Sequence, residues 1–249
     1  MISLNIVISY DYKKEIIAIW KTFYIIFLSE GNEKALKKRY YLYFLLLAVT
    51  LFFVVSWFIT IIGGGLPLID KWMQSFAAIY AETPIYTIFR WITELGSKHF
   101  VQPFTIVMTI IIWWIFRDWL PALTFGLGVL GSHLLNNFIK ELVARERPSI
   151  SVVLNAEGFS YPSGHAMVSI VCYGLLAFFI AKKLKSSTSI LLVQFTTALI
   201  VFLIGLSRPF LNVHYLTDVA TGFFLGFFFF IGLVYLYEFI QRKRKKVKA

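Results

Sequence analysis

The fold is decided by the stretch Phe100–Ile139, which reads FVQPFTIVMTIIIWWIF-RD-WLPALTFGLGVLGSHLLNNFI. It contains two strongly apolar runs, and only Arg117 and Asp118 separate them. A helix that crosses a lipid bilayer needs roughly 20 predominantly apolar residues, and both runs approach this length. Because these two polar residues leave no room for a long loop, the two runs are predicted to form a tight hairpin of membrane-spanning helices.

The composition of the whole chain agrees with a membrane protein. Of its 249 residues 59% are hydrophobic and 15% are charged, and the mean hydropathy is +0.75. A soluble domain is typically about half apolar and about a quarter charged. The single cysteine, Cys172, lies in an apolar run and is predicted to be a buried small hydrophobe. The same length criterion gives six spans: Tyr40–Ile62, Phe100–Phe116, Trp119–Ile139, His165–Ala181, Ile190–Leu206 and Val219–Ile240. The predicted fold class is therefore an all-α, polytopic bundle of six transmembrane helices.

Three further segments complete the predicted organisation. Residues 1–39 combine apolar residues at helical spacing with lysines, so they are predicted to form an amphipathic interfacial helix, with a weak seventh span as the alternative. Residues 40–241 form the six-helix domain, and 242–249 form a basic tail. The tail is expected to contact anionic lipids rather than nucleic acid. Residues 63–99 are predicted to be an outer loop with one or two short surface helices, including Asp70–Tyr80.

Lysine and arginine are distributed unevenly over the predicted loops. Of the 24 Lys and Arg residues, seventeen lie with the N-terminal region, Arg117, the loop 182–185 and the tail, and seven lie on the other side. Cytoplasmic loops are enriched in these cations. The chain is therefore predicted to lie in the plasma membrane with both termini in the cytoplasm and the seven-cation side facing outward.

Polar patterns at three places interrupt the apolar sequence. They are Lys140-x6-Arg147-Pro148, Pro162-Ser163-Gly164-His165 and Ser207-Arg208-x5-His214-x3-Asp218. Each pattern lies at the boundary of a predicted span. No span separates the first pattern from the second, and two spans separate the second from the third. All three must therefore lie on the same side of the membrane, whichever way the chain is oriented.

The residue types in these patterns suit the binding of phosphate. Lys140, Arg147 and Arg208 can surround a phosphate dianion, and arginine matches its oxygens in a bidentate fashion. Ser163 and Gly164 stand at a predicted helix start, where a hydroxyl, backbone N–H groups and the helix dipole all favour an anion.

The remaining residues suit transfer of the phosphoryl group. His214 and Asp218 are spaced i, i+4, so they share a helix face, and Asp218 can fix the imidazole tautomer while the other ring nitrogen attacks phosphorus. His165 is available as an acid and base. A metal site built on His214 and Asp218 is the alternative, but the nearby cations would repel a divalent metal.

These patterns resemble the signature of the type 2 phosphatidic acid phosphatase (PAP2) family, and all eleven residues of that signature are present. The resemblance implies a phosphatase that needs no metal, and no cofactor is expected. The charge bias described above would place its active site at the outer end of the bundle. The resemblance also implies that His214 accepts the phosphoryl group, that Asp218 supports it, and that His165 acts as acid and then base. The phosphate-binding residues would be Lys140, Arg147, Ser163, Gly164 and Arg208. The six-span form is similar to bacterial phosphatidylglycerophosphate and undecaprenyl-diphosphate phosphatases.

The expected substrate is a lipid phosphate or an isoprenoid diphosphate, such as phosphatidylglycerophosphate, phosphatidate or undecaprenyl diphosphate. Alternatives are a phosphatase of a soluble sugar phosphate and a lipid phosphotransferase, because a phosphohistidine can serve water or a hydroxyl acceptor. A catalytically inactive membrane scaffold or transporter is the alternative from a different class. No nucleic-acid partner is expected.

Other polar residues near the patterns have simpler interpretations. His133, Asn136 and Asn137 share one face of the third span and are predicted to form interhelical hydrogen bonds. Asn137 lies one turn from Lys140, so it is a candidate for supporting the site. Arg145 is expected to be solvated, with contact to a second phosphate as the alternative.

Overall fold

The computed structural model describes residues 41, 45, 52, 55–80, 83–148 and 158–248. Every regular element within those residues is an α-helix, and the residues from Trp57 onward form one compact unit. The helices are α3 (Leu68–Tyr80), α4 (Pro84–Glu94), α5 (Lys98–Phe116), α6 (Trp119–Val143), α7 (Gly164–Ala181), α8 (Ser187–Phe210) and α9 (Leu216–Lys248). The two short helices predicted in the outer loop are thus present as α3 and α4.

The described residues contain five segments that are long and apolar enough to cross a membrane. They are Pro84–Phe116, Trp119–Val143, Gly164–Ala181, Ser187–Phe210 and Leu216–Lys245. These correspond to the five spans predicted from Phe100 onward, so the all-helical membrane architecture is confirmed. The predicted first span, 40–62, lies mostly outside the described residues, and the interfacial segment 1–39 lies wholly outside them.

The predicted hairpin of α5 and α6 is confirmed, and its turn has a simple chemistry. Arg117 adopts the left-handed conformation with φ 50° and donates its backbone N–H to the carbonyl of Trp113, which ends α5. Asp118 follows as the N-cap of α6, and its carboxylate accepts the backbone N–H of Leu120 at 3.1 Å. A side-chain oxygen at this position satisfies a donor that would otherwise have no partner in the helix.

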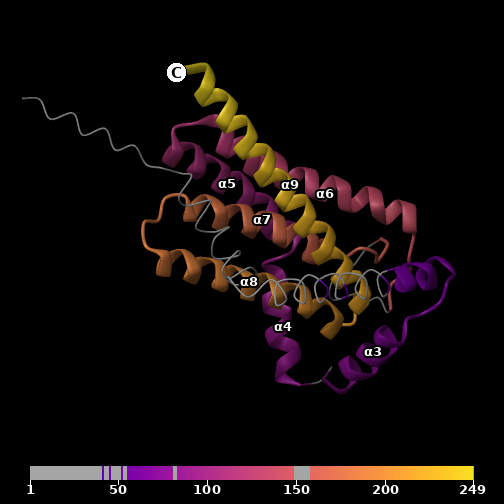
Figure 1. Cartoon of the computed structure of the whole chain (residues 1–249). Coiled ribbons are helices and arrows are strands. Elements are labelled where there is room, and N and C mark those ends of the chain that lie inside the picture. The colour runs from indigo at the N-terminus through magenta and orange to yellow at the C-terminus, as the bar shows by residue number, and fades with distance from the viewer. Residues whose placement is uncertain are drawn as a thin grey trace, which may run out of the picture. The chain divides into compact units, whose positions relative to one another are not determined.

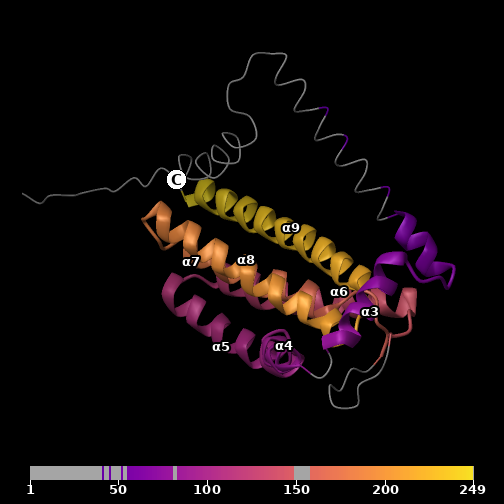
Figure 2. The same ribbon diagram turned by 90° about the horizontal axis from the view of Figure 1, so that it is seen from below.

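Helix α7 is the centre of the bundle, because it packs against α6, α8 and α9. Figures 1 and 2 show the long helices running alongside one another, whereas α4 is steeply inclined to them. Cys172 is fully buried, as predicted. The other fully buried apolar residues of α7 with at most 1% exposure are Ala166, Met167, Val168, Val171, Leu175 and Phe179.

Close packing of α7 against α9 brings two of the sequence patterns together. A side chain on Gly222 of α9 would place its Cβ 2.6 Å from the carbonyl oxygen of Ser163. Only glycine permits this approach, and small residues at helix contacts are typical of membrane proteins. The second turn of α9 therefore lies directly beside the start of α7.

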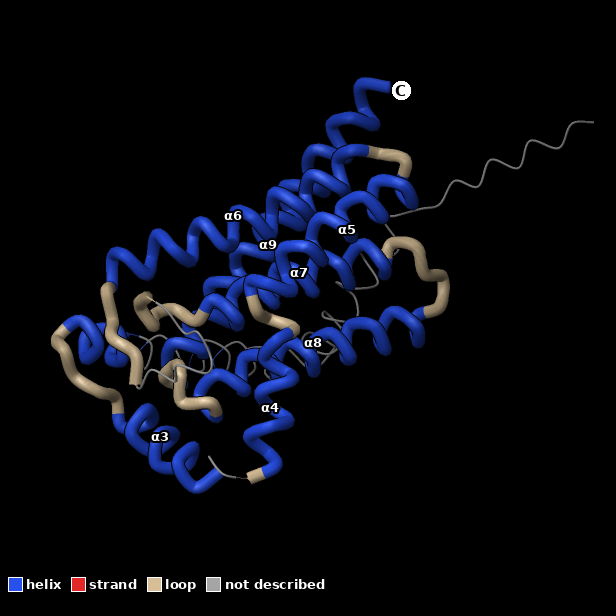
Figure 3. Tube along the Cα trace, turned by 180° about the vertical axis from the view of Figure 1, so that it is seen from behind, coloured by secondary structure: helices blue, strands red, loops and turns tan. Residues whose placement is uncertain are grey.

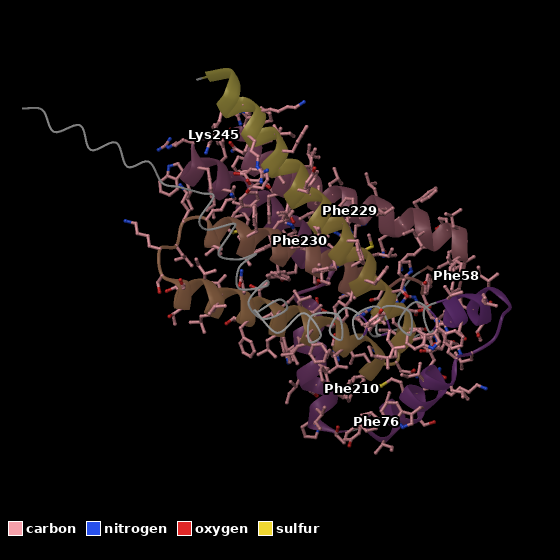
Figure 4. The ribbon with its side chains drawn as sticks, viewed as in Figure 1. Phe58, Phe76, Phe210, Phe229, Phe230 and Lys245 are labelled. Atoms are coloured by element: carbon pink, nitrogen blue, oxygen red, sulfur yellow. The ribbon has the colours of Figure 1, made fainter. Side chains whose placement is uncertain are left out.

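Aromatic rings attach α3 and α4 to the end of α8. Phe210 stacks on Phe89 of α4 with ring centroids 4.4 Å apart, and it meets Phe76 of α3 edge-on at 5.6 Å. Figure 4 shows Phe76 and Phe210 side by side at this end of the bundle. Aromatic pairs at such distances add about 0.5–1.5 kcal/mol each beyond the area they bury. Helix α3 is thus held on the bundle by one face.

The connections gather at the two ends of the bundle, as the tan segments in Figure 3 show. At the end away from α3, Lys182 pairs with Glu238 at 2.5 Å and Arg244 pairs with Asp118 at 2.9 Å. Helix α9 continues through Lys248, so the predicted basic tail 242–249 begins as part of this helix. One cation of the tail, Arg244, is therefore paired within the protein.

Candidate active site

All three sequence patterns meet at the end of the bundle that carries α3. Lys140 lies in the last turn of α6, Arg208 lies in the last turn of α8, and Asp218 lies in the first turn of α9. Ser163 is the N-cap of α7, followed by Gly164 and His165. The prediction that these patterns share one side is confirmed by their contacts.

The turn before α7 is held by neighbours on two sides. The backbone N–H of Ser163 donates to the carbonyl of Asp218 at 3.0 Å. Asn136 of α6 donates its side-chain amide to the carbonyl of Pro162 at 3.2 Å. The N–H of Ser163 is therefore engaged, contrary to the expectation that it is free for phosphate. The Ser163 hydroxyl is buried and has no hydrogen-bond partner among the described residues.

The turn between α8 and α9 presents His214. Asn212 has φ 53°, a left-handed conformation that asparagine tolerates better than most residues, and Val213 donates its N–H to the carbonyl of Arg208 at 3.2 Å. The turn thereby brings His214 back toward Arg208. His214 is only 3% exposed.

The ring of His214 has distinct neighbours at its two nitrogens. Nη1 of Arg147 lies 3.0 Å from Nε2, and Oδ2 of Asp218 lies 3.4 Å from Nδ1. Since a guanidinium can only donate, Nε2 must carry the lone pair, which assigns the proton to Nδ1. Nδ1 is close to Asp218 without forming a well-directed hydrogen bond to it. This tautomer is the one that leaves Nε2 able to attack.

Burial lowers the pKa of His214 well below its ordinary value of 6.5, and the positive charges of Arg208 and Arg147 lower it further. Burial also lowers the pKa of the Arg147 guanidinium, while Asp218 opposes that shift. The protonated imidazole is disfavoured because it would be a further cation in a buried, positive site. His214 is consequently neutral at neutral pH, as a nucleophile must be.

Asp218 is fully buried and is held by donors from three directions. Its Oδ1 accepts from Nη1 of Arg145 at 2.5 Å, and its Oδ2 accepts from the hydroxyl of Ser160 at 2.7 Å. The backbone N–H of Tyr215 donates to Oδ2 at 3.0 Å. These bonds fix the orientation of the carboxylate beside His214.

The three predicted phosphate-binding cations donate to neutral groups. Lys140 Nζ donates to the carbonyl of Phe159 at 2.7 Å. Arg147 donates to the carbonyl of Val213 at 2.7 Å, and Arg208 donates to the hydroxyl of Thr93 at 2.7 Å. Bonds to carbonyls and hydroxyls are weaker than bonds to an anion, so a phosphate can replace them with a net gain.

Several buried donors at this end of the bundle have no hydrogen-bond partner among the described residues. They include Ser163 Oγ, Arg208 Nε and His214 Nδ1. Buried polar atoms without partners are rare in folded proteins, because each such atom is costly. Their concentration here fits a site that takes up an anion.

His165 packs against the junction between α4 and α5. A Cβ on Gly96 would lie 2.9 Å from Cδ2 of the His165 ring, so glycine is required there. The imidazole is within electrostatic reach of four other site residues, namely Arg208, His214, Lys140 and Arg147. His165 therefore belongs to the same cluster as His214.

The sequence interpretation of Arg145 was wrong. Its side chain is only 8% exposed, and it forms ion pairs with Asp70 and Asp218. Asn137 is exposed, and Asn136 is the residue that supports the turn before α7. The interhelical hydrogen bond predicted for Asn136 is confirmed by its contact with Sδ of Met167 on α7 at 3.7 Å. Nε2 of His133, for which the same was predicted, is buried and has no hydrogen-bond partner among the described residues.

Other residues around the site were not identified from the sequence. Asp70, Thr93, Ser160 and Thr217 are all buried and all bond to site residues or to Arg145. The one sign of these residues in the sequence was Asp70 itself, a charged residue in the amphipathic segment that forms α3. Within the described ranges no group of three or more His, Cys, Asp or Glu residues could hold a metal ion.

Comparisons with known proteins agree with this geometry. The model of the PAP2 superfamily matches residues 121–242, which contain all three sequence patterns. Phosphatidylglycerophosphatase B of Bacillus subtilis is 31% identical over 181 residues, covering 71% of this chain and 87% of that protein. Dolichyldiphosphatase of Saccharomyces cerevisiae is 24% identical over 163 residues, covering 60% of this chain and 68% of that protein.

A solved structure shares the fold as well. The crystal structure of a transmembrane PAP2-type phosphatidylglycerolphosphate phosphatase from Bacillus subtilis superposes with a TM-score of 0.65 at 27% identity. The superposition covers 76% of this chain and 94% of that chain. The match in sequence, fold and site pattern shows that this chain belongs to the PAP2 superfamily, whose phosphatases are phosphoric ester hydrolases.

Proposed function

We propose that this chain is an integral-membrane lipid phosphatase that hydrolyses a phosphomonoester or diphosphate of a lipid through a phosphohistidine on His214. The observation that carries the proposal is the 3.0 Å contact between Arg147 Nη1 and His214 Nε2. A cation suited to bind phosphate thus touches the nitrogen suited to attack phosphorus. Substrate bound to this cation would be held within reach of the nucleophile.

The first half of the reaction transfers the phosphoryl group to the enzyme. Lys140, Arg147 and Arg208 bind the phosphate oxygens, and Ser163 and the start of α7 add donors. Nε2 of His214 attacks phosphorus while the bond to the leaving oxygen breaks. Protonated His165 donates its proton to that oxygen, and the lipid alcohol or lipid monophosphate departs.

The second half regenerates the enzyme. Neutral His165 accepts a proton from water, and the water oxygen attacks the phosphorus of the phosphohistidine. The P–N bond breaks, inorganic phosphate leaves, and His214 recovers its lone pair. Asp218 stabilises the positive charge on the imidazole between the two steps, since its carboxylate lies 3.4 Å from Nδ1.

The position of the site supports a lipid substrate. Its residues lie in the first or last turns of apolar helices or in the connections next to them, which supports a location of the phosphate chemistry near the level of lipid headgroups. A lipid could therefore present its phosphate while its tail stays in the bilayer. The names of the relatives favour phosphatidylglycerophosphate first and an isoprenoid diphosphate second.

The proposal is tested by phosphate release from purified protein in detergent. The substrates are phosphatidylglycerophosphate, phosphatidate, undecaprenyl diphosphate and a soluble sugar phosphate. Release from the lipids and not from the sugar phosphate is expected, and His214→Ala should abolish it. His99→Ala, which removes an exposed histidine outside the site, is the matched control and should retain full activity.

The outcomes separate the alternatives. Preference for the sugar phosphate would make the chain a soluble-substrate phosphatase. Transfer to an added lipid alcohol, in place of phosphate release, would make it a phosphotransferase. Absence of turnover on every substrate, with intact fold, would favour a scaffold or transporter and overturn the proposal.

A further inference from the structure

Asp70 is a fully buried aspartate in the first turn of α3. It lies outside residues 121–242, the part of the chain that the superfamily model matches. Its Oδ1 accepts the backbone N–H of Thr217 at 2.9 Å. Its Oδ2 accepts from the hydroxyl of Thr217 at 2.6 Å and from Nη2 of Arg145 at 2.8 Å. Both oxygens are therefore bonded to the region next to the proposed nucleophile.

Arg145 connects Asp70 to Asp218. Its Nη2 donates to Asp70, and its Nη1 donates to Oδ1 of Asp218 at 2.5 Å and to Oγ1 of Thr217 at 2.8 Å. The guanidinium carbon also lies 3.9 Å from the centre of the Tyr215 ring. One planar, fully charged fork thus holds two buried carboxylates, which a lysine could not do with the same geometry.

The network reaches the reacting histidine through Asp218. Oδ1 of Asp218 is fixed by Arg145, so Oδ2 is the oxygen that faces Nδ1 of His214 at 3.4 Å. Asp70 in turn partly neutralises the positive charge of Arg145 through their ion pair. Without Asp70, that charge would act on Asp218 alone and weaken the carboxylate as a partner for a positively charged imidazole.

Helix α3 is well placed to hold this network because it is anchored separately. Phe76, on the same helix, packs edge-on against Phe210 at the end of α8, with ring centroids 5.6 Å apart. Figure 4 shows the two residues close to each other. The carboxylate of Asp70 and the ring of Phe76 thus join α3 to the bundle by two different kinds of contact.

We propose that Asp70 and Arg145 are positioning residues for the reaction, which hold the orientation and charge balance of Asp218 and thereby control phosphoryl transfer at His214. This inference rests on the proposed function. It makes α3 a part of the active site rather than a surface helix. It also gives α3, which precedes the matched region, a defined role.

The test compares Asp70→Asn with Phe76→Leu in purified protein. Asp70→Asn removes the charge and keeps the shape, whereas Phe76→Leu loosens the same helix without touching the carboxylates. We expect Asp70→Asn to lower kcat by about 10- to 100-fold with KM changed by less than about twofold, because substrate binding is intact and positioning is lost. Phe76→Leu should lower the melting temperature and leave kcat near wild type.

A double-variant cycle with Arg145→Lys distinguishes positioning from general destabilisation. If both residues act through Asp218, the double variant should have the kcat of the worse single variant, because the second change has nothing left to disturb. Arg145→Lys also provides a second reading if Asp70→Asn fails to fold. The single variants should slow formation of the phosphoenzyme in rapid-quench experiments.

Two results would overturn the inference. One is wild-type kcat in Asp70→Asn or in Arg145→Lys. The other is a loss of kcat in Phe76→Leu that is as large as the loss in Asp70→Asn, when the two variants have similar melting temperatures. Failure of the proposed function is recognised separately, since it would appear as an absence of phosphate release by the wild-type protein itself.

Discussion

Arg147 holds its Nη1 3.0 Å from Nε2 of His214. The same guanidinium donates to the carbonyl of Val213, and its Nε donates to the carbonyl of Gly158 at 2.9 Å. If the site binds phosphate as proposed, Arg147 would exchange these contacts with the protein for contacts with the substrate. This exchange would release Nε2 of His214, the proposed nucleophile.

If the proposed phosphohistidine forms, it should accumulate when the second step is removed. In His165→Ala, a substrate with a good leaving group should still phosphorylate His214, but hydrolysis should be severely slowed because no base activates water. Labelled phosphate should remain on the protein, stable in base and lost in acid, and His165→Ala/His214→Ala should carry none. Label recovered on Ser163 would refute His214 as the nucleophile.

Ser160 is expected to matter although it lies outside the three patterns. Its hydroxyl is buried and donates to Oδ2 of Asp218 at 2.7 Å. We predict that Ser160→Ala lowers the free energy of unfolding by about 1 kcal/mol, because a buried carboxylate loses a donor. It should also lower kcat by about 10-fold, because Asp218 can rotate away from His214. Thermal unfolding and phosphate release measure these effects.

The matched control for that experiment is Ser75→Ala. Ser75 lies on α3, is exposed, and donates only to a carbonyl of its own helix, that of Lys71 at 3.1 Å. Its loss should leave both the unfolding free energy and kcat unchanged. Equal activity of Ser160→Ala and Ser75→Ala would mean that the hydroxyl bond to Asp218 has no part in catalysis.

The sequence predicted the helices and the convergence of the patterns, because hydrophobic length and topological parity do not depend on side-chain detail. The sequence did not predict the pairing of Asp70 with Arg145, because 75 positions separate the two residues. Their contact depends on the packing of α3 against α8 and α9. An arginine at a variable position within the first pattern is predicted to be solvated when its partner is unknown.

The pH dependence should reflect a neutral His214. Burial, Arg208 and Arg147 hold the pKa of His214 well below 6.5, so the acid limb of kcat/KM due to this residue should lie below pH 6.5. Arg147→Gln removes a neighbouring positive charge, which makes protonation easier and raises the pKa. The acid limb should then move to higher pH, after correction for the second ionisation of the substrate phosphate near about pH 6.

A suitable control for this profile is Arg90→Gln. Arg90 is an exposed arginine on α4, so its charge is screened by solvent and its loss should leave the acid limb in place. If Arg147→Gln leaves the limb unchanged or moves it to lower pH, then the charge of Arg147 does not control the ionisation of His214.

Metal independence remains a prediction, and it follows from the cations of the site. Lys140, Arg147 and Arg208 can supply the positive charge that Mg²⁺ supplies in many phosphoryl transfers. Activity should survive an excess of EDTA, whereas vanadate, which resembles five-coordinate phosphorus, should inhibit. Loss of activity on chelation, with recovery on addition of a divalent metal, would contradict the roles assigned to these cations.

The orientation of the site is the remaining prediction, and it rests on the excess of Lys and Arg near both termini. It places α3 outside the cytoplasm and the loop between α7 and α8 inside. In a Cys172→Ser background, a membrane-impermeant maleimide added to intact cells should label Ser75→Cys and not Ser187→Cys. Both positions are exposed, so each should be labelled once the cells are permeabilised. The reverse pattern would put the site in the cytoplasm and exclude substrates confined to the outer leaflet.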